Sequence, residues 1–253
     1  WRRTVTRLSL NGLVSLSAVT GLFIAPSCST TEPEGGGVET NLRITLAPSI
    51  TTRVTGTAFD EEDAIGLSVV PWSDGREQPL SSSRWEDNVK FVYRDGQFVS
   101  SATAYFPDAT TANTFYAYYP YTDRAAVDVT AVPVSVPAVQ TRSESDPLAT
   151  LAAHDFLYAV TCGIKKGDNA VNLQFKHLFS ALEIRLTTDL RAKLEGVIFR
   201  CVSNENAAVS MENATVDLRT GEVNVSEAVV SNAVRLDCSG NTSDTEALVL
   251  HLV

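Results

Sequence analysis

The chain has 253 residues, of which 44% are hydrophobic and 20% charged, and its formal net charge is −10. This length suits one large or two ordinary domains, and the apolar fraction excludes general disorder. An acidic chain without a basic run argues against nucleic-acid binding, which needs clustered Lys and Arg. Abundant Val, Thr and Ser with a single Met and 10 Pro indicate strands joined by turns.

The N-terminus has the pattern of an export signal. Arginines at positions 2, 3 and 7 precede an uncharged apolar stretch over residues 8–24, and Ala25-Pro26-Ser27-Cys28 closes it. The apolar stretch is short of the roughly 20 residues that a membrane-spanning helix needs. A small residue just before Cys28 resembles the lipobox of bacterial lipoproteins. We therefore expect residues 1–27 to be a signal peptide and Cys28 to be diacylated; the alternative is an ordinary signal peptide cleaved near Ser27.

Residues 28–41 predict a flexible tether. Ser29–Gly37 is polar and rich in glycine, which is typical of a linker. A cysteine that carries more than one acyl chain anchors a protein stably to a membrane. The expected location is therefore the outer membrane, with the folded part outside it.

Three cysteines remain once Cys28 is lipidated: Cys162, Cys201 and Cys238. None of their spacings matches a metal site. An exported protein can oxidise one pair and leave a thiol over. Free buried thiols are favoured here, because all three cysteines lie in or beside apolar strands.

From residue 42 onward the chain predicts short strands. Leu42, Ile44 and Leu46 alternate with polar neighbours, which indicates a first strand over Leu42–Pro48 followed by a polar stretch over residues 49–56. The acidic turn Asp60–Asp63 precedes an apolar strand over residues 65–72. Asp95-Gly96, between strands at 89–93 and 97–99, is a strong hairpin signal.

The remaining strands are expected at regular intervals, with one short helical turn over residues 145–153. Pro133 and Pro137 restrict the strand over residues 127–139 to an edge. Further strands are expected over residues 114–121, 156–160, 171–186, 197–202, 214–218, 221–225, 234–236 and 248–253.

This spacing predicts an all-β chain of two tandem β-sandwich domains, over residues 42–168 and 169–253. The second domain is short beside the first and its last residues read as a core strand. We therefore expect that its closing strands are absent from this sequence.

No motif predicts catalysis, a cofactor or a metal site. His177 lies in an apolar strand, where a structural imidazole is the expected role, and His154 and His251 stand alone. Asp60–Asp63 lacks the staggered ligand pattern of a calcium loop and reads as a solvated turn. The sequence predicts a protein that is not an enzyme, with no cofactor and no metal.

The aromatic strand around residues 115–121 allows two readings. Alternation places Phe115, Tyr119 and Tyr121 on one face and Tyr116 and Tyr118 on the other. Either face could be a platform for stacking carbohydrate, although core packing is the more common use.

For the core we expect five buried apolar side chains: Phe175, Phe179, Leu182, Ile65 and Leu67.

Five segments in this order, after a lipoprotein signal, resemble the fimbrillin-like lipoproteins of Bacteroidota, the major and minor subunits of type V pili. The segments are Thr52–Gly56, Phe59–Gly66, Tyr116–Tyr121, Asp155–Ala159 and Leu173–Leu182. The resemblance implies two transthyretin-like β-sandwich domains and export to the outer membrane and cell surface. It also implies assembly with other fimbrial subunits and a role in adhesion to host or bacterial surfaces.

The resemblance further implies assembly by strand exchange, in which maturation cuts after an arginine behind the first strand and a neighbour's strand fills the groove. In this sequence Leu42–Pro48 is the candidate removable strand and Arg53 the candidate cleavage site, since Arg43 lies inside the strand. The alternative is a subunit that is never cut, so major, anchor and tip roles stay open. A surface glycan-binding lipoprotein is the alternative function.

Overall fold

The computed structural model describes residues 42–51, 58–78, 85–100, 102–123, 128–146, 148–167, 170–187, 193–239 and 247–253. The signal peptide (1–27), the tether (28–41) and Arg53 lie outside these residues. In the described part almost every element is a strand, and its single helix is α1 (Ala149–His154), which confirms the all-β fold class. This helix is too short to cross a membrane.

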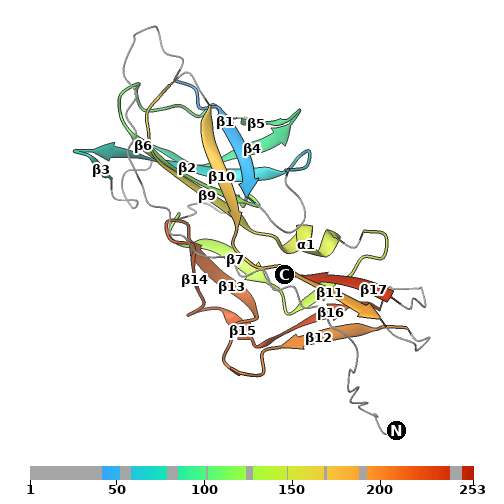
Figure 1. The fold of residues 1–253 in the computed structure, drawn as a ribbon. Coiled ribbons are helices and arrows are strands. Elements are labelled where there is room, and N and C mark those ends of the chain that lie inside the picture. Colours follow the sequence, from blue (N-terminus) through green and yellow to red (C-terminus); the bar gives the residue numbers. More distant parts are fainter. Residues whose placement is uncertain are drawn as a thin grey trace.

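One large sheet occupies the upper half of Figure 1. Its strands are β1 (Leu46–Thr51), β2 (Ala64–Ser73), β3 (Arg76–Glu77), β4 (Glu86–Arg94), β5 (Gln97–Ser100), β6 (Asn113–Tyr119), β9 (Leu157–Ile164) and β10 (Val171–His177). Their order is β1-β10-β9-β6-β2-β4-β5, with β3 added beside β2. The sheet curls so that its end strands, β1 and β5, lie close together.

Three smaller sheets form the lower half of Figure 1. Their strands are β7 (Val132–Val136), β8 (Val139–Thr141), β11 (Leu182–Thr187), β12 (Gly196–Arg200), β13 (Ser210–Asp217), β14 (Glu222–Asn224), β15 (Val229–Ser231), β16 (Ala233–Asp237) and β17 (Ala247–Leu252). Strand β13 pairs with β7, β14 and β15, β16 pairs with β12 and β8, and β11 pairs with β17.

The large sheet buries apolar side chains on both of its faces. Inside the curl, Ile65, Leu67 and Phe115 belong to a cluster with fully buried Phe175. On the outer face, side chains of β2, β6 and β9 pack against β7 and β13 in a second cluster. Since β2 and β6 lie between two layers, they are apolar on both faces instead of alternating.

The predicted hairpin turn is confirmed. Asp95 and Gly96 have positive φ (51° and 78°) and join β4 to β5, as a two-residue hairpin requires. Gly221, with φ of 75°, follows Thr220 in the turn between β13 and β14.

The core prediction is confirmed for Ile65, Leu67 and Phe175, each of which is fully buried. Phe179 and Leu182 are only half-buried. The reason is that residues 171–186 are not one strand: β10 ends at His177 in the large sheet, and β11 pairs with β17 in another. Phe179 lies in the connection between the two strands, and Leu182 is the first residue of β11.

The first strand is displaced from its predicted position. Strand β1 begins at Leu46 and continues through Ser49, Ile50 and Thr51, which were expected in a polar loop. The alternation of Leu42, Ile44 and Leu46 extends to Ile50, which packs against the inner cluster, so the apolar face is longer than the sequence pattern indicated.

The sheets interleave along the chain. The expected domain boundary at 168/169 separates β9 from β10, yet these strands pair with each other. Strands β7 and β8, on the N-terminal side of that boundary, pair with β13 and β16. One sequence position therefore does not divide the two halves, because pairing joins strands that are distant along the chain.

The cysteines differ from one another. Cys238 is buried and Cys201 half-buried, and both are free thiols. Cys162 is disulfide-bonded, which corrects the expectation of a free thiol at this position.

Candidate functional site

The candidate site is the seam where the first strand closes the curled sheet. Strand β1 lies at one end of the large sheet and pairs in parallel with β10 from Leu46 to Thr51. The ladder starts where the Val171 N–H donates to the Thr45 carbonyl oxygen at 2.8 Å. This is the one parallel pairing within the large sheet as described, and it leaves the first strand in an edge position.

Residues 42–44 have a different partner. The Ile44 N–H donates to the Ala104 carbonyl oxygen, and the Phe106 N–H donates to the Leu42 carbonyl oxygen, both at 2.8 Å. These bonds form an antiparallel bridge between Arg43 and Tyr105. The segment 42–51 thus changes its main-chain partner at Thr45.

The side chains of this segment fill the inner core. Ile44 and Leu46 are 3% and 7% exposed, and Leu42 and Ile50 pack against the same cluster. Removing the segment would uncover β10, whose Leu173 and Phe175 are fully buried in the register opposite Pro48 and Ile50.

A cavity of about 310 Å³ lies beside the point where the partner changes. Its walls are Arg43–Thr45, Phe91, Gln97–Ser100, Ala102 and Ala104. The cavity separates the first segment from β5, so the two ends of the curled sheet approach each other without a continuous main-chain ladder.

The segment 104–106 is itself held by two side chains that sequence reasoning missed. The indole Nε1–H of Trp85 donates to the Tyr105 carbonyl oxygen, and the Tyr105 N–H donates to Glu86 Oε1, both at 2.9 Å. Nothing in the local sequence signals these contacts, because they join residues about twenty positions apart, on the two sides of the hairpin formed by β4 and β5.

The two site residues predicted from the sequence are not among those described. Arg53 follows the end of β1 at Thr51 by two residues, and Cys28 lies in the N-terminal part. The structure therefore describes the strand that precedes the candidate cleavage site and leaves the site itself untested.

The histidine and acidic candidates have local partners. His177 Nδ1 lies 2.7 Å from Asp155 Oδ1. In the acidic turn, Glu62 forms a two-point contact with Arg94, at 2.8 and 2.9 Å, and Asp63 accepts from the Tyr119 hydroxyl. The described residues contain no group of three or more His, Cys, Asp or Glu side chains arranged so that they could hold a metal ion.

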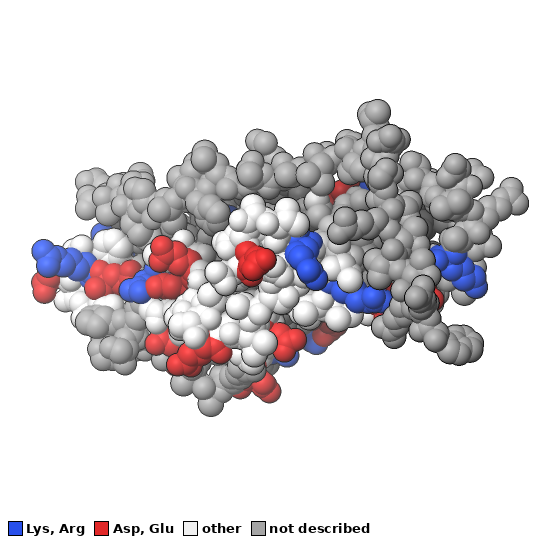
Figure 2. All heavy atoms as spheres, turned by 90° about the horizontal axis from the view of Figure 1, so that it is seen from below, with Lys and Arg blue, Asp and Glu red and all other residues white. Residues whose placement is uncertain are grey.

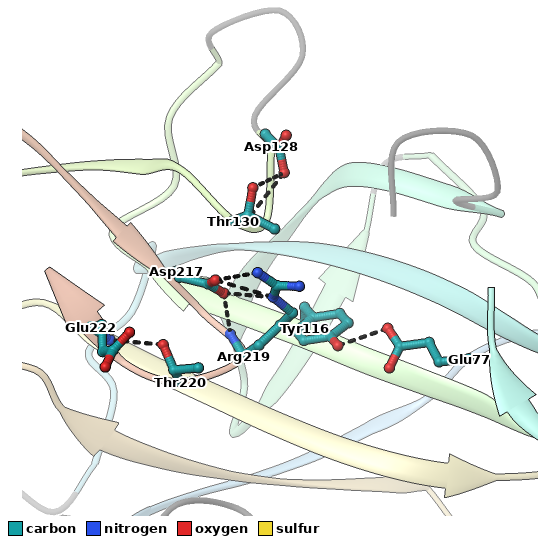
Figure 3. Close-up of polar contacts among 8 residues, drawn as sticks. All are labelled: Glu77, Tyr116, Asp128, Thr130, Asp217, Arg219, Thr220 and Glu222. Carbon is teal, nitrogen blue, oxygen red and sulfur yellow. Dashed lines mark hydrogen bonds and ion pairs between the residues drawn. The ribbon is translucent and has the colours of Figure 1, made fainter. Parts of the chain in front are cut away.

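The aromatic strand is core on both faces. Tyr116 and Tyr118 are each 3% exposed, and Phe115 is fully buried. The Tyr116 hydroxyl donates to Glu77 Oε1 at 2.7 Å (Figure 3), and burial is the main cause that raises its pKa. The expected alternation is present, but the second layer covers the face that could have stacked on carbohydrate.

The same close-up shows how the halves meet. Arg219, in the turn after β13, lies beside Tyr116 of β6 and is paired with Asp217 at 2.9 Å (Figure 3). On the face shown in Figure 2, the coloured acidic and basic side chains occur in small, mixed groups.

Four sheets packed around apolar clusters, with the first strand at an edge of the largest, make the described part of the chain an all-β protein. The chain belongs to the fimbrillin-like family, which matches residues 52–251. Members of this family are structural proteins and not enzymes. No curated protein matches the chain.

Two solved structures are similar in fold. A candidate cell adhesion protein from Bacteroides ovatus has 17% identity and a TM-score of 0.52, over 83% of this chain and 77% of its own. A candidate cell adhesion protein from Bacteroides uniformis has 20% identity and a TM-score of 0.51, over 84% of this chain and 76% of its own. At these identities the likeness concerns the fold.

Proposed function

We propose that the protein is an exported fimbrial subunit that is held in the outer membrane through a lipid on Cys28 until cleavage after Arg53 separates it from this anchor, and that it then assembles by strand exchange. Its partners are other fimbrial subunits, and the assembled fimbria mediates adhesion at the cell surface. Family membership supports the fimbrial role, and the two similar structures, named for cell adhesion, are in keeping with it.

The observation that carries the proposal is the edge position of the first strand. A strand at the end of a sheet can be replaced by another strand, because the main-chain groups it leaves are a template for pairing. Among the described residues, strand β1 has β10 as its single strand partner, and its apolar side chains occupy the inner core. An incoming strand with the same alternation would restore both the ladder and the core.

Spontaneous exchange is expected to be slow. Burying an aliphatic side chain contributes about 1.5–3 kcal/mol, and Ile44 and Leu46 are both buried. While the segment is covalently joined to the domain, it also returns to its place after each opening. Cleavage after Arg53 makes its departure irreversible, so proteolysis acts as the trigger.

The assembly test uses the mature full-length protein with and without an arginine-specific protease. We expect uncut protein to stay monomeric and protein cut after Arg53 to form ladders that resist mild detergent. Arg53→Ala should block both the cleavage and the formation of ladders. Arg200→Ala, at an exposed position of β12, should leave both unchanged. Ladders that form equally well from uncut Arg53→Ala protein contradict cleavage-gated exchange and favour an uncut anchor or tip subunit.

The anchor test replaces Cys28 by alanine. Wild-type protein should incorporate labelled fatty acid and fractionate with the outer membrane, and Cys28→Ala should do neither. Because lipidation uses the sulfur of Cys28, a mature protein that retains this residue in a disulfide contradicts the anchor. Membrane retention of Cys28→Ala does so as well.

The alternative of glycan binding receives no separate support. It requires the aromatic strand to be an exposed platform, but Tyr116 is buried between the layers and Phe115 is buried inside the curled sheet.

A further inference from the structure

We propose that Trp85 and Glu86 form a latch that controls how fast the first strand leaves its place. The inference rests on the proposed function for its biological meaning, since release of the strand matters only if strands exchange. The geometry on which it stands belongs to the uncut protein.

The latch acts through Tyr105. In the bridge between Arg43 and Tyr105, the flanking residues 104 and 106 exchange hydrogen bonds with residues 42 and 44. The N–H and carbonyl of Tyr105 itself therefore point away from the first strand. Glu86 accepts from this N–H and the Trp85 indole donates to this carbonyl, so two side chains occupy the place of a neighbouring strand.

The latch connects the first strand to the centre of the large sheet. The main-chain N–H of Trp85 donates to the Val69 carbonyl oxygen at 2.8 Å, and Glu86 is paired with Val69 in the ladder between β4 and β2. Val69 is fully buried. A rigid central strand thus positions residues 85 and 86, these hold Tyr105, and the residues around Tyr105 hold Leu42 and Ile44.

Residues 104–106 have no other regular strand partner among the described residues. Their position depends on the latch and on side-chain burial, chiefly of Phe106, whose ring contacts Phe115 at a centroid distance of 5.5 Å. Without the latch, the main-chain bonds to Leu42 and Ile44 open more often.

The order in which contacts break after cleavage makes the contacts of residues 42–44 important for the rate of release. After a cut behind β1, the new end at Thr51 is free to separate from β10, and separation proceeds toward Thr45. The last contacts to break are then those of residues 42–44 with residues 104–106, together with the buried Ile44 side chain. The latch therefore acts on the final step.

The first experiment measures amide hydrogen exchange in the uncut protein, so it does not depend on cleavage. Trp85→Phe removes the indole donor but keeps an aromatic ring, and Glu86→Ala removes the acceptor. Each should make the Ile44 and Phe106 amides exchange about 5- to 10-fold faster, the effect of one lost hydrogen bond. The amide of Ala117, in the middle of β6, should be unchanged and reports global stability.

Glu86→Gln is the matched control, because its amide oxygen still accepts from the Tyr105 N–H. It should exchange at the wild-type rate. Unchanged exchange at Ile44 and Phe106 in both Trp85→Phe and Glu86→Ala overturns the latch, and so does an equal acceleration in Glu86→Gln.

The second experiment follows release of the N-terminal fragment by mass spectrometry after the arginine-specific cut, in a reducing buffer because Cys162 is disulfide-bonded. Trp85→Phe and Glu86→Ala should release it about 5- to 10-fold faster than wild type at an equal extent of cleavage. Equal release rates overturn control by the latch. A wild-type protein that is not cut at Arg53 contradicts the proposed function instead, and hydrogen exchange then decides the latch separately.

Discussion

Gly221 offers a direct test of how the two halves of the molecule are docked. It lies in the turn between β13 and β14, with φ of +75°. A Cβ atom there would lie 2.3 Å from the Tyr158 hydroxyl oxygen and 2.9 Å from its Cζ. Since Tyr158 belongs to β9 of the large sheet and is buried, the turn presses against the outer face of that sheet.

The cost of Gly221→Ala has two parts. An alanine in the left-handed region costs about 1–2 kcal/mol. Forcing Tyr158 to move in a packed layer adds about 1–3 kcal/mol. Gly96→Ala is the matched control, because Gly96 has φ of +78° and nothing within 4 Å of its added Cβ. It should show the backbone cost alone.

The assay is equilibrium unfolding of the wild type and both single variants in urea. Unchanged m-values show that a shift of the midpoint reports a change in stability. We expect Gly221→Ala to lose about 2–5 kcal/mol of stability, clearly more than Gly96→Ala. Tyr158→Phe removes the clashing oxygen and should restore part of the loss in the double variant, a coupling that a double-mutant cycle measures. Equal losses for Gly221→Ala and Gly96→Ala, or no coupling to Tyr158, refute the docking contact.

Three further outcomes are expected. Phe175→Ala should cost about 3–5 kcal/mol in the same assay, whereas Val99→Ala, at a 40% exposed position, should cost little; an unchanged midpoint for Phe175→Ala contradicts its core position. Half-buried Cys201, whose pKa a hydrogen bond to Ser203 lowers, should be alkylated faster than Cys238, whose pKa burial raises; equal rates contradict this. Burial raises the pKa of Tyr118 to about 12. The contribution of Tyr118 to the free energy of unfolding is therefore fully present below the unfolded-state pKa of about 10 and should be lost as the pH rises toward 12. Tyrosinate absorbance should report ionisation of Tyr118 together with unfolding.

Local patterns determined much of this protein without any structure. Asp95-Gly96 specifies its hairpin because both residues tolerate positive φ, and adjacent strands need no distant information to pair. The alternation of Leu42, Ile44 and Leu46 identified an inward-facing segment, and Phe175 was recognised as core. The order of the family segments identified the fimbrillin-like resemblance, which the family match confirms.

Other features exist only in three dimensions. The sequence alone could not place His177 at the end of β10, since recurring apolar residues through positions 171–186 fit one strand as well as two strands in different sheets. Nor could it decide that both faces of β6 are buried, because alternation gives two faces and only the docking of β13 covers the second.

The seam of the first strand has both kinds of feature: some follow from the local sequence, and others depend on the tertiary structure. Its inward-facing residues follow from a period of two along the backbone, which is a local property. Its change of partner at Thr45, and the capture of Tyr105 by Trp85 and Glu86, depend on main-chain groups that must find hydrogen-bond partners wherever the folded chain brings them. Those partners are set by the curl of the whole sheet, so only the tertiary structure decides them.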